Sequence, residues 1–172
     1  MCVNRKTVVE ERIERICRLN RFSVFIVMRK AKRILEQYRD SQVNSGNIIS
    51  NEELIIHRFK KAVRKKYEQT YVYKQGEKTG SIDYMLMEIM GTEWAGQIME
   101  NVFEKMRDFD KCGADLVTII DNYYTSDSPM DDVDIQVELD MTRSYYYRMK
   151  KAATALFGIL LWNTVIDKCI ND

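Results

Sequence analysis

The stretch Asp132–Trp162, DVDIQVELDMTRSYYYRMKKAATALFGILLW, predicts two helices joined by a tight break. Ile135 and Leu139 are four residues apart, so they share one face of a short acidic helix. The pattern is interrupted after Leu139, and the hydroxyl of Thr142 is suited to cap the exposed N–H groups of the next helix. This arrangement indicates a helix-turn-helix within residues 130–165.

The second helix of this pair has one apolar face and one polar face. Its apolar residues recur at spacings of three and four, which predicts a single buried stripe: Tyr146, Met149, Ala153, Leu156 or Phe157, and Leu160. A capped helix with basic, polar and aromatic groups on its first turns is the form that enters the DNA major groove. The candidate DNA-binding residues are Thr142, Arg143, Ser144, Tyr145, Tyr147, Arg148, Lys150 and Lys151.

The candidate residues divide by expected role. Those expected to face base edges at the start of the helix are Arg143, Ser144 and Tyr147. Those expected to hold phosphates are Thr142, Arg148, Lys150 and Lys151. Tyr145 can donate its hydroxyl to a phosphate or touch a base edge.

The run DIQVELDMTRSYYYRMKKAA, residues 134–153, resembles the helix-turn-helix of sigma-70 region 4. It is more closely similar to phage late-transcription regulators of the ArpU and RinA type. In that family a D-I-x-x-E-L-x-M-S-R-S-x-Y-Y-R-x-K-K-x-A pattern closes the chain, with an F-G-x-x-L-W-like apolar end. Residues 116–124 resemble the helix that precedes the motif, and Asp140 occupies the turn position where glycine is common.

The resemblance implies an all-α DNA-binding transcriptional regulator from a phage or a phage-related mobile element. Its expected role is activation of late or packaging genes in the cytoplasm of a bacterial host. The partners it implies are double-stranded promoter DNA and, through a region-4-like surface, host RNA polymerase.

Two other classes of protein fit the same residues. One is an oligomeric packaging protein, such as a small-terminase-like subunit or a protein that redirects packaging, because these also combine helix-turn-helix elements with helical oligomerisation. The other is a regulator that binds only proteins, with the motif as scaffold. DNA affinity at low salt and the mass in solution separate the three classes.

Composition predicts an all-α helical bundle. The chain of 172 residues is 45% hydrophobic, has a single proline and is rich in helix-forming residues. Its longest apolar runs, residues 22–28 and 155–162, are too short to span a bilayer, and no secretory signal opens the chain, so no membrane is expected. The four scattered cysteines are expected to be reduced thiols.

Charge is distributed unevenly along the chain. Residues 1–75 carry a balance of +10 and residues 76–172 a balance of −9. The change falls at KQGEKTG, residues 74–80, which predicts a basic N-terminal helical region (1–75) and a C-terminal helical domain (80–172). Basic residues of the first region are candidate additional DNA contacts: Arg58, Lys61, Arg64 and Lys65. Alternatively, the basic half docks on the acidic half, within the chain or between subunits.

Periodicity predicts further helices along the chain. The ranges are 7–40 with a break at 20–25, 51–73, 81–109 with break points at Gly91 and Gly96, and 115–124. Ser128 is the predicted cap of the first motif helix, with Pro129 at its first helical position. The methionine-rich stripe in residues 81–109 is expected to be core, with an adaptable partner groove as the alternative.

The end of the last helix is apolar on more than one face, so either preceding helices or a second subunit must cover it. A homo-oligomer, a dimer or higher, is therefore expected, which suits recognition of two DNA half-sites. Enzyme activity is not expected. The single histidine, His57, has no recognisable partner, and neither a metal site nor a cofactor motif is predicted.

Overall fold

The computed structural model describes residues 6–43, 51–65 and 80–171. These residues form eight α-helices and one π-helical turn and contain no strand, which confirms the all-α prediction. The elements are α1 (Val8–Leu19), α2 (Val24–Val43), α3 (Glu52–Lys65), α5 (Gly80–Ile89), α6 (Glu93–Arg107), α7 (Gly113–Ile120), η2 (Asp121–Thr125), α8 (Asp132–Glu138) and α9 (Arg143–Asn171).

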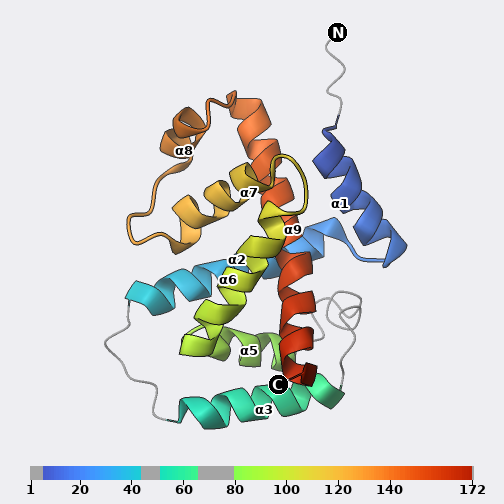
Figure 1. Ribbon diagram of the computed structural model, residues 1–172, viewed down its shortest axis with the longest axis vertical. Helices are drawn as coiled ribbons and strands as arrows, with labels where there is room; N and C mark the ends of the chain where they lie inside the picture. Colours follow the sequence, from blue (N-terminus) through green and yellow to red (C-terminus); the bar gives the residue numbers. More distant parts are fainter. Residues whose placement is uncertain (1–5, 44–50, 66–79, 172) are drawn as a thin grey trace.

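The 29-residue helix α9 is the axis of the fold (Figure 1). Helices α1, α2, α6 and α7 pack along it, and α3 crosses near its C-terminal end. The apolar end of α9 is buried by these helices of the same chain, with Phe157, Leu161 and Trp162 each at most 1% exposed. The expectation of an oligomer therefore no longer follows from this surface.

Helices on both sides of the predicted domain boundary contribute to one hydrophobic core. Leu35 on α2 and Phe59 on α3 belong to the same buried cluster as Phe157 on α9. The Nζ of Lys30 on α2 also lies 2.7 Å from a carboxylate oxygen of Asp83 on α5. The basic half thus docks on the acidic half at this point, as the alternative interpretation of the charge pattern predicts. Residues 74–79 of the predicted linker lie outside the described residues.

Several predicted element boundaries are confirmed and two are wrong. The break after residue 20 separates α1 from α2, and Gly91 lies between α5 and α6. Gly96, however, lies inside α6. The cap of α8 is Asp131, which accepts a hydrogen bond from the Asp134 N–H at 2.9 Å, rather than Ser128. An aspartate caps a helix as well as a serine does, and the prediction overlooked Asp131, three residues further along the chain.

The methionine-rich stripe is core, as expected. Met90, Met99 and Met106 are at most 3% exposed in the packing of α5 and α6. Only α9 among the described helices has the length and apolar composition to cross a membrane, and 67% of its apolar window is buried inside the protein. A helix covered to this extent is consistent with the core helix of a soluble protein.

Candidate nucleic-acid interface

Helices α8 and α9 are joined by a three-residue turn and a cap. Asp140 adopts a left-handed conformation with φ of 49°, which an aspartate tolerates better than most side chains. It thereby takes the conformation for which glycine is common at this turn position. The hydroxyl of Thr142 accepts a hydrogen bond from the Tyr145 N–H at 3.3 Å, so the predicted cap is present.

A small set of contacts fixes α8 against α9. Ile135 is fully buried, and it is the single buried residue of α8. The Asp132 carboxylate accepts a hydrogen bond of 2.7 Å from the Tyr146 hydroxyl and one of 2.6 Å from Lys150 Nζ. At its C-terminal end, α8 is held by Asn122 of η2, whose amide donates to Glu138 at 3.2 Å. The short helix thus depends on one apolar anchor and three polar contacts.

Four of the candidate residues form an exposed stripe on the first turns of α9, called here the α9 stripe: Arg143, Ser144, Tyr147 and Lys151. The guanidinium of Arg143 lies 6.0 Å from the centre of the Tyr147 ring, so these two side chains are adjacent. The opposite face of the helix is fixed in the core by Tyr146, which is 0% exposed. The stripe is therefore presented by a rigid element and not by a loop.

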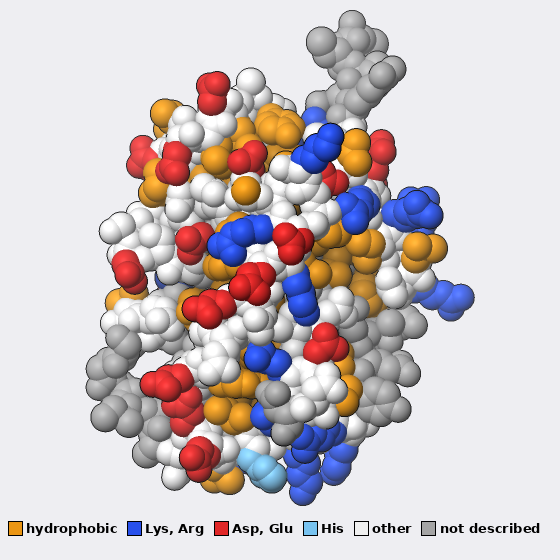
Figure 2. Space-filling view, viewed as in Figure 1, with side chains coloured by type: hydrophobic (Ala, Val, Ile, Leu, Met, Phe, Trp, Pro, Cys, Tyr) orange, Lys and Arg blue, Asp and Glu red, His pale blue; other side chains and the backbone are white. Residues whose placement is uncertain are grey.

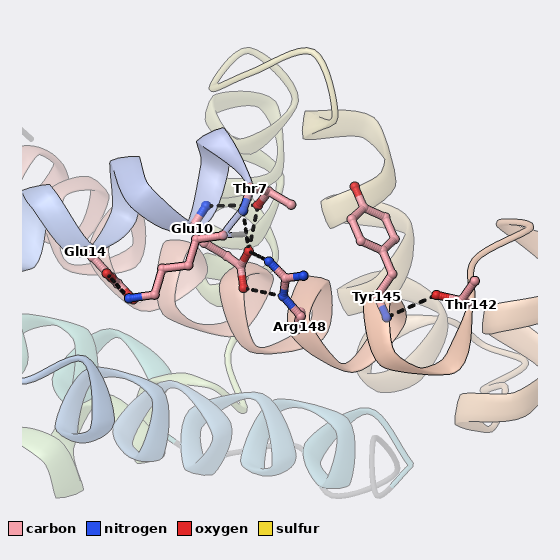
Figure 3. A network of polar contacts seen from close by, with 7 residues as sticks. Thr7, Glu10, Glu14, Thr142, Tyr145 and Arg148 are labelled. Carbon is pink, nitrogen blue, oxygen red and sulfur yellow. Dashed lines mark hydrogen bonds and ion pairs between the residues drawn. The ribbon is translucent and has the colours of Figure 1, made fainter. Parts of the chain in front are cut away.

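Arg148, predicted to hold a phosphate, is bound to a carboxylate of α1 (Figure 3). Its Nε and one terminal nitrogen lie 3.0 and 2.5 Å from the two oxygens of Glu10. Burial on its own would raise the pKa of Glu10, but hydrogen bonds from Arg148 and Thr7 outweigh it and lower the pKa below its ordinary value. The same bond raises the pKa of Arg148. The charge of Arg148 is thus largely matched within the chain.

Lys150 is also engaged within the chain. Besides its contact with Asp132, its Nζ lies 3.4 Å from the centre of the Tyr123 ring. Tyr145 is not part of the α9 stripe, and its N–H donates to the Thr142 hydroxyl (Figure 3). Partial burial and the neighbouring acidic groups raise the pKa of its hydroxyl. Of the eight motif residues predicted to bind DNA, two therefore have their charges paired inside the protein.

The four additional candidates lie at the other end of the molecule. Arg64 on α3 donates a hydrogen bond of 2.6 Å to the Cys169 carbonyl, in the last turn of α9. At 1.5 Å per residue, this point is roughly 40 Å from Arg143. The other three residues, Arg58, Lys61 and Lys65, are exposed on the same helix. Lys and Arg side chains gather at the lower edge of the molecule (Figure 2), where α3 lies in Figure 1. They do not share a surface with the α9 stripe.

The outer face of α8 is acidic. Asp131, Asp134, Glu138 and Asp140 are all exposed there. Two apolar side chains, Val133 and Val137, lie exposed on the same helix at 64% and 73%. Carboxylates repel DNA phosphates, so we expect this face of α8 to lie away from the DNA backbone.

No metal-binding cluster of His, Cys, Asp and Glu side chains occurs among the described residues. His57 is exposed on α3, where it was expected at the surface. Burial and the nearby Glu14 raise the pKa of the Cys17 thiol to about 11, and no disulfide joins the cysteines of the described segments. In comparisons with protein-family models, curated proteins and solved structures, nothing matches this chain.

Sequence reasoning missed the partner that α1 provides. Glu10 is three residues after Thr7, and the two form a reciprocal capping box at the start of α1. The capping pattern could have been found in the sequence, but the contact with Arg148, 138 residues away, could not.

Proposed function

We propose that this chain is a DNA-binding transcriptional regulator of a phage or phage-related mobile element, acting on late or packaging genes. The observation that carries the proposal is the α9 stripe, where Arg143, Ser144, Tyr147 and Lys151 are exposed on the first turns of a helix whose opposite face is buried. The N-terminal end of α9 also favours a nearby phosphate, because its free N–H groups carry partial positive charge.

In this proposal the α9 stripe enters the major groove. Arg143 donates to a guanine edge, Ser144 and Tyr147 contact neighbouring bases, and Lys151 holds a phosphate. Arg148 and Lys150 contribute less, because Glu10 and Asp132 already match their charges. The acidic outer face of α8 is then free for a protein such as host RNA polymerase, a partner that the resemblance to sigma-70 region 4 suggests.

A dimer on two half-sites is part of the proposal. Its interface has to come from a surface other than the apolar end of α9, which the chain itself covers. The mass in solution, with and without duplex, measures this assembly directly.

The test starts from a library of random-sequence duplexes, from which the purified full-length chain selects its preferred site. Binding of the selected duplex and of a scrambled duplex is then measured across a salt series. We expect a preference for the selected site that Arg143→Ala removes and that Arg107→Ala, an exposed arginine on α6, leaves intact. Equal binding of both duplexes by the unaltered protein would overturn the proposal.

A further inference from the structure

A cavity of about 390 Å³ opens between α2, η2 and α9. This volume is within the usual range for small-molecule sites, about 300–1,000 Å³. Tyr147 and Lys151 of the α9 stripe form part of its wall, yet the cavity itself extends beneath them to Tyr124 and Thr154, which are 3% and 6% exposed. It is therefore a site with depth and not only a basic surface.

Four of the lining residues are aromatic. They are Phe25 on α2, Tyr123 and Tyr124 on η2, and Tyr147 on α9. The π-helical turn carries two of these rings on successive residues, with their centres 4.7 Å apart and their planes at 69°, so it presents both an edge and a face. Phe25 is 68% exposed, and the guanidinium of Arg29 lies 5.2 Å from the centre of its ring, so an aromatic ring and a cation of α2 lie side by side in the cavity wall. Irregular π-turns of this kind are frequent at functional sites.

Positive charge surrounds these rings. Four cations line the cavity, namely Arg29 and Lys32 from α2 and Lys150 and Lys151 from α9, and no carboxylate is among the lining residues. Lys150 is paired with Asp132, and Lys32 lies 3.8 Å from Glu36. Lys151 is exposed and forms no ion pair with a described residue. An occupant that carries negative charge is favoured, because four cations and no carboxylate line the cavity.

We propose that this cavity binds a small planar aromatic anion, such as a nucleoside monophosphate or an aromatic carboxylate. Its ring lies among Phe25, Tyr124 and Tyr147, and its anionic group meets Arg29 and Lys151. A neutral ring makes no use of the charge of Lys151, and an inorganic anion leaves the aromatic side chains in water. Duplex DNA can reach the cations at the rim, but its stacked bases cannot fill the cavity.

The test uses isothermal titration calorimetry on the full-length chain without DNA. The probes are adenosine 5′-monophosphate and 2-naphthoate, which distinguish a nucleotide site from an arylcarboxylate site. Adenosine and inorganic phosphate are the matched controls that carry only the ring or only the anion. We expect one of the two probes to bind saturably and more tightly than either control. Absence of binding by both probes, or equal binding by adenosine or phosphate, would overturn the proposal.

Two variants locate the site. Phe25→Ala and Arg29→Ala should each weaken probe binding at least about fivefold, from loss of a ring contact or of a charge-assisted hydrogen bond. Their matched controls are Leu54→Ala, an exposed apolar residue on α3, and Arg33→Ala, an exposed arginine on α2 outside the cavity. Unchanged probe affinity in Phe25→Ala and Arg29→Ala, or equal loss in the controls, would contradict the assignment. Loss of duplex affinity alone in these variants would assign the cations to DNA instead.

One consequence rests on the proposed DNA-binding function. Because Tyr147 and Lys151 belong to both the cavity and the α9 stripe, the bound anion and DNA should compete, and the probe should weaken duplex binding. The calorimetric test involves no DNA, so a failure of the proposed function leaves the ligand site standing, and the reverse also holds.

Discussion

Glu10 at the start of α1 and Arg148 in the second turn of α9 form a two-point ion pair, with nitrogen–oxygen distances of 2.5 and 3.0 Å. The same carboxylate accepts a hydrogen bond from the N–H of Thr7 at 2.7 Å (Figure 3). The Glu10 side chain therefore caps the N-terminus of α1 and also attaches this helix to α9. Since Arg148 is one residue from Tyr147, this contact also holds in place the turn of α9 that carries the α9 stripe.

Replacement of Glu10 by Gln should destabilise the protein in a pH-dependent way. The pKa of Glu10 is lowered in the folded state, so its contribution to stability is present above its ordinary value of 4.5 and is lost as the pH falls through the folded pKa. Thermal unfolding should therefore give a lower Tm for Glu10→Gln than for the unaltered protein at pH 7. Plots of Tm against pH for the two proteins should converge below pH 4.5. Glu11→Gln, in the same helical turn, is the control, and an equal effect there would assign the loss to the helix dipole instead.

The single apolar anchor of α8 should determine whether this helix stays folded. Ile135→Ala removes a fully buried side chain and should cost about 2–4 kcal/mol of local stability, since α8 has no other buried residue. Hydrogen exchange should become faster in α8 while the second half of α9 stays protected. Val137→Ala, 73% exposed on the same helix, should change neither. Uniform loss of protection throughout the protein would show that α8 does not unfold on its own.

Arg143→Ala tests the reading of base edges by the α9 stripe. Loss of a two-point contact with guanine should cost about 1–3 kcal/mol of binding to the preferred duplex and relax the preference at one base position. Binding of a scrambled duplex should change much less. The measurement is a comparison of dissociation constants over single-base variants of the selected site. If the loss is the same for every sequence, Arg143 contacts a phosphate and not a base.

Lys151→Ala tests a phosphate contact. Affinity should fall for all duplexes alike, and the slope of log K against log salt should become shallower by about 1, because one fewer counterion is released. The control is Lys65→Ala on α3, at the far end of α9, which should leave the slope unchanged. A reduced slope in Lys65→Ala would place a DNA contact on α3, as the charge pattern predicts.

Two glycines should respond oppositely to alanine. A Cβ at Gly113 would lie 2.3 Å from the Arg107 carbonyl oxygen, so Gly113→Ala should destabilise the junction of α6 and α7. A Cβ at Gly96 would meet nothing within 4 Å, and Gly96→Ala should stabilise α6 by about 0.5–1 kcal/mol. The denaturant concentration at the midpoint of unfolding measures both effects, provided that the slope of the unfolding free energy against denaturant concentration is unchanged. A stable Gly113→Ala protein would mean that the α6–α7 junction can move apart.

The local features of the helix-turn-helix region could be predicted from sequence because they arise from neighbouring residues. The cap at Thr142 and the buried positions of Tyr146 and Met149 follow from a residue type and a spacing of three to four. The start of α8 was predicted wrongly, since Ser128 and Asp131 have the same capping chemistry and only the folded chain uses Asp131.

The charge balance does not show which basic residues share a surface with the α9 stripe. The count of basic residues favoured α3, but Arg64 there caps the end of α9, roughly 40 Å from Arg143. Arg29 and Lys32, on α2, are the basic residues that lie beside Tyr147 and Lys151. A charge balance records how many ions a segment has, while the surface they share depends on how the helices pack.

The sequence by itself determined the all-α class, the break between α1 and α2, and the two faces of the first turns of α9, because helix formation depends on residues within four positions of each other. Tertiary structure alone decided which charged side chains are paired within the protein and which are exposed to a ligand or to DNA. Packing set Glu10 against Arg148, Asp132 against Lys150, and the rings of η2 beside Phe25. These contacts join residues that are distant along the chain, and their energies depend on distances that only the folded core fixes.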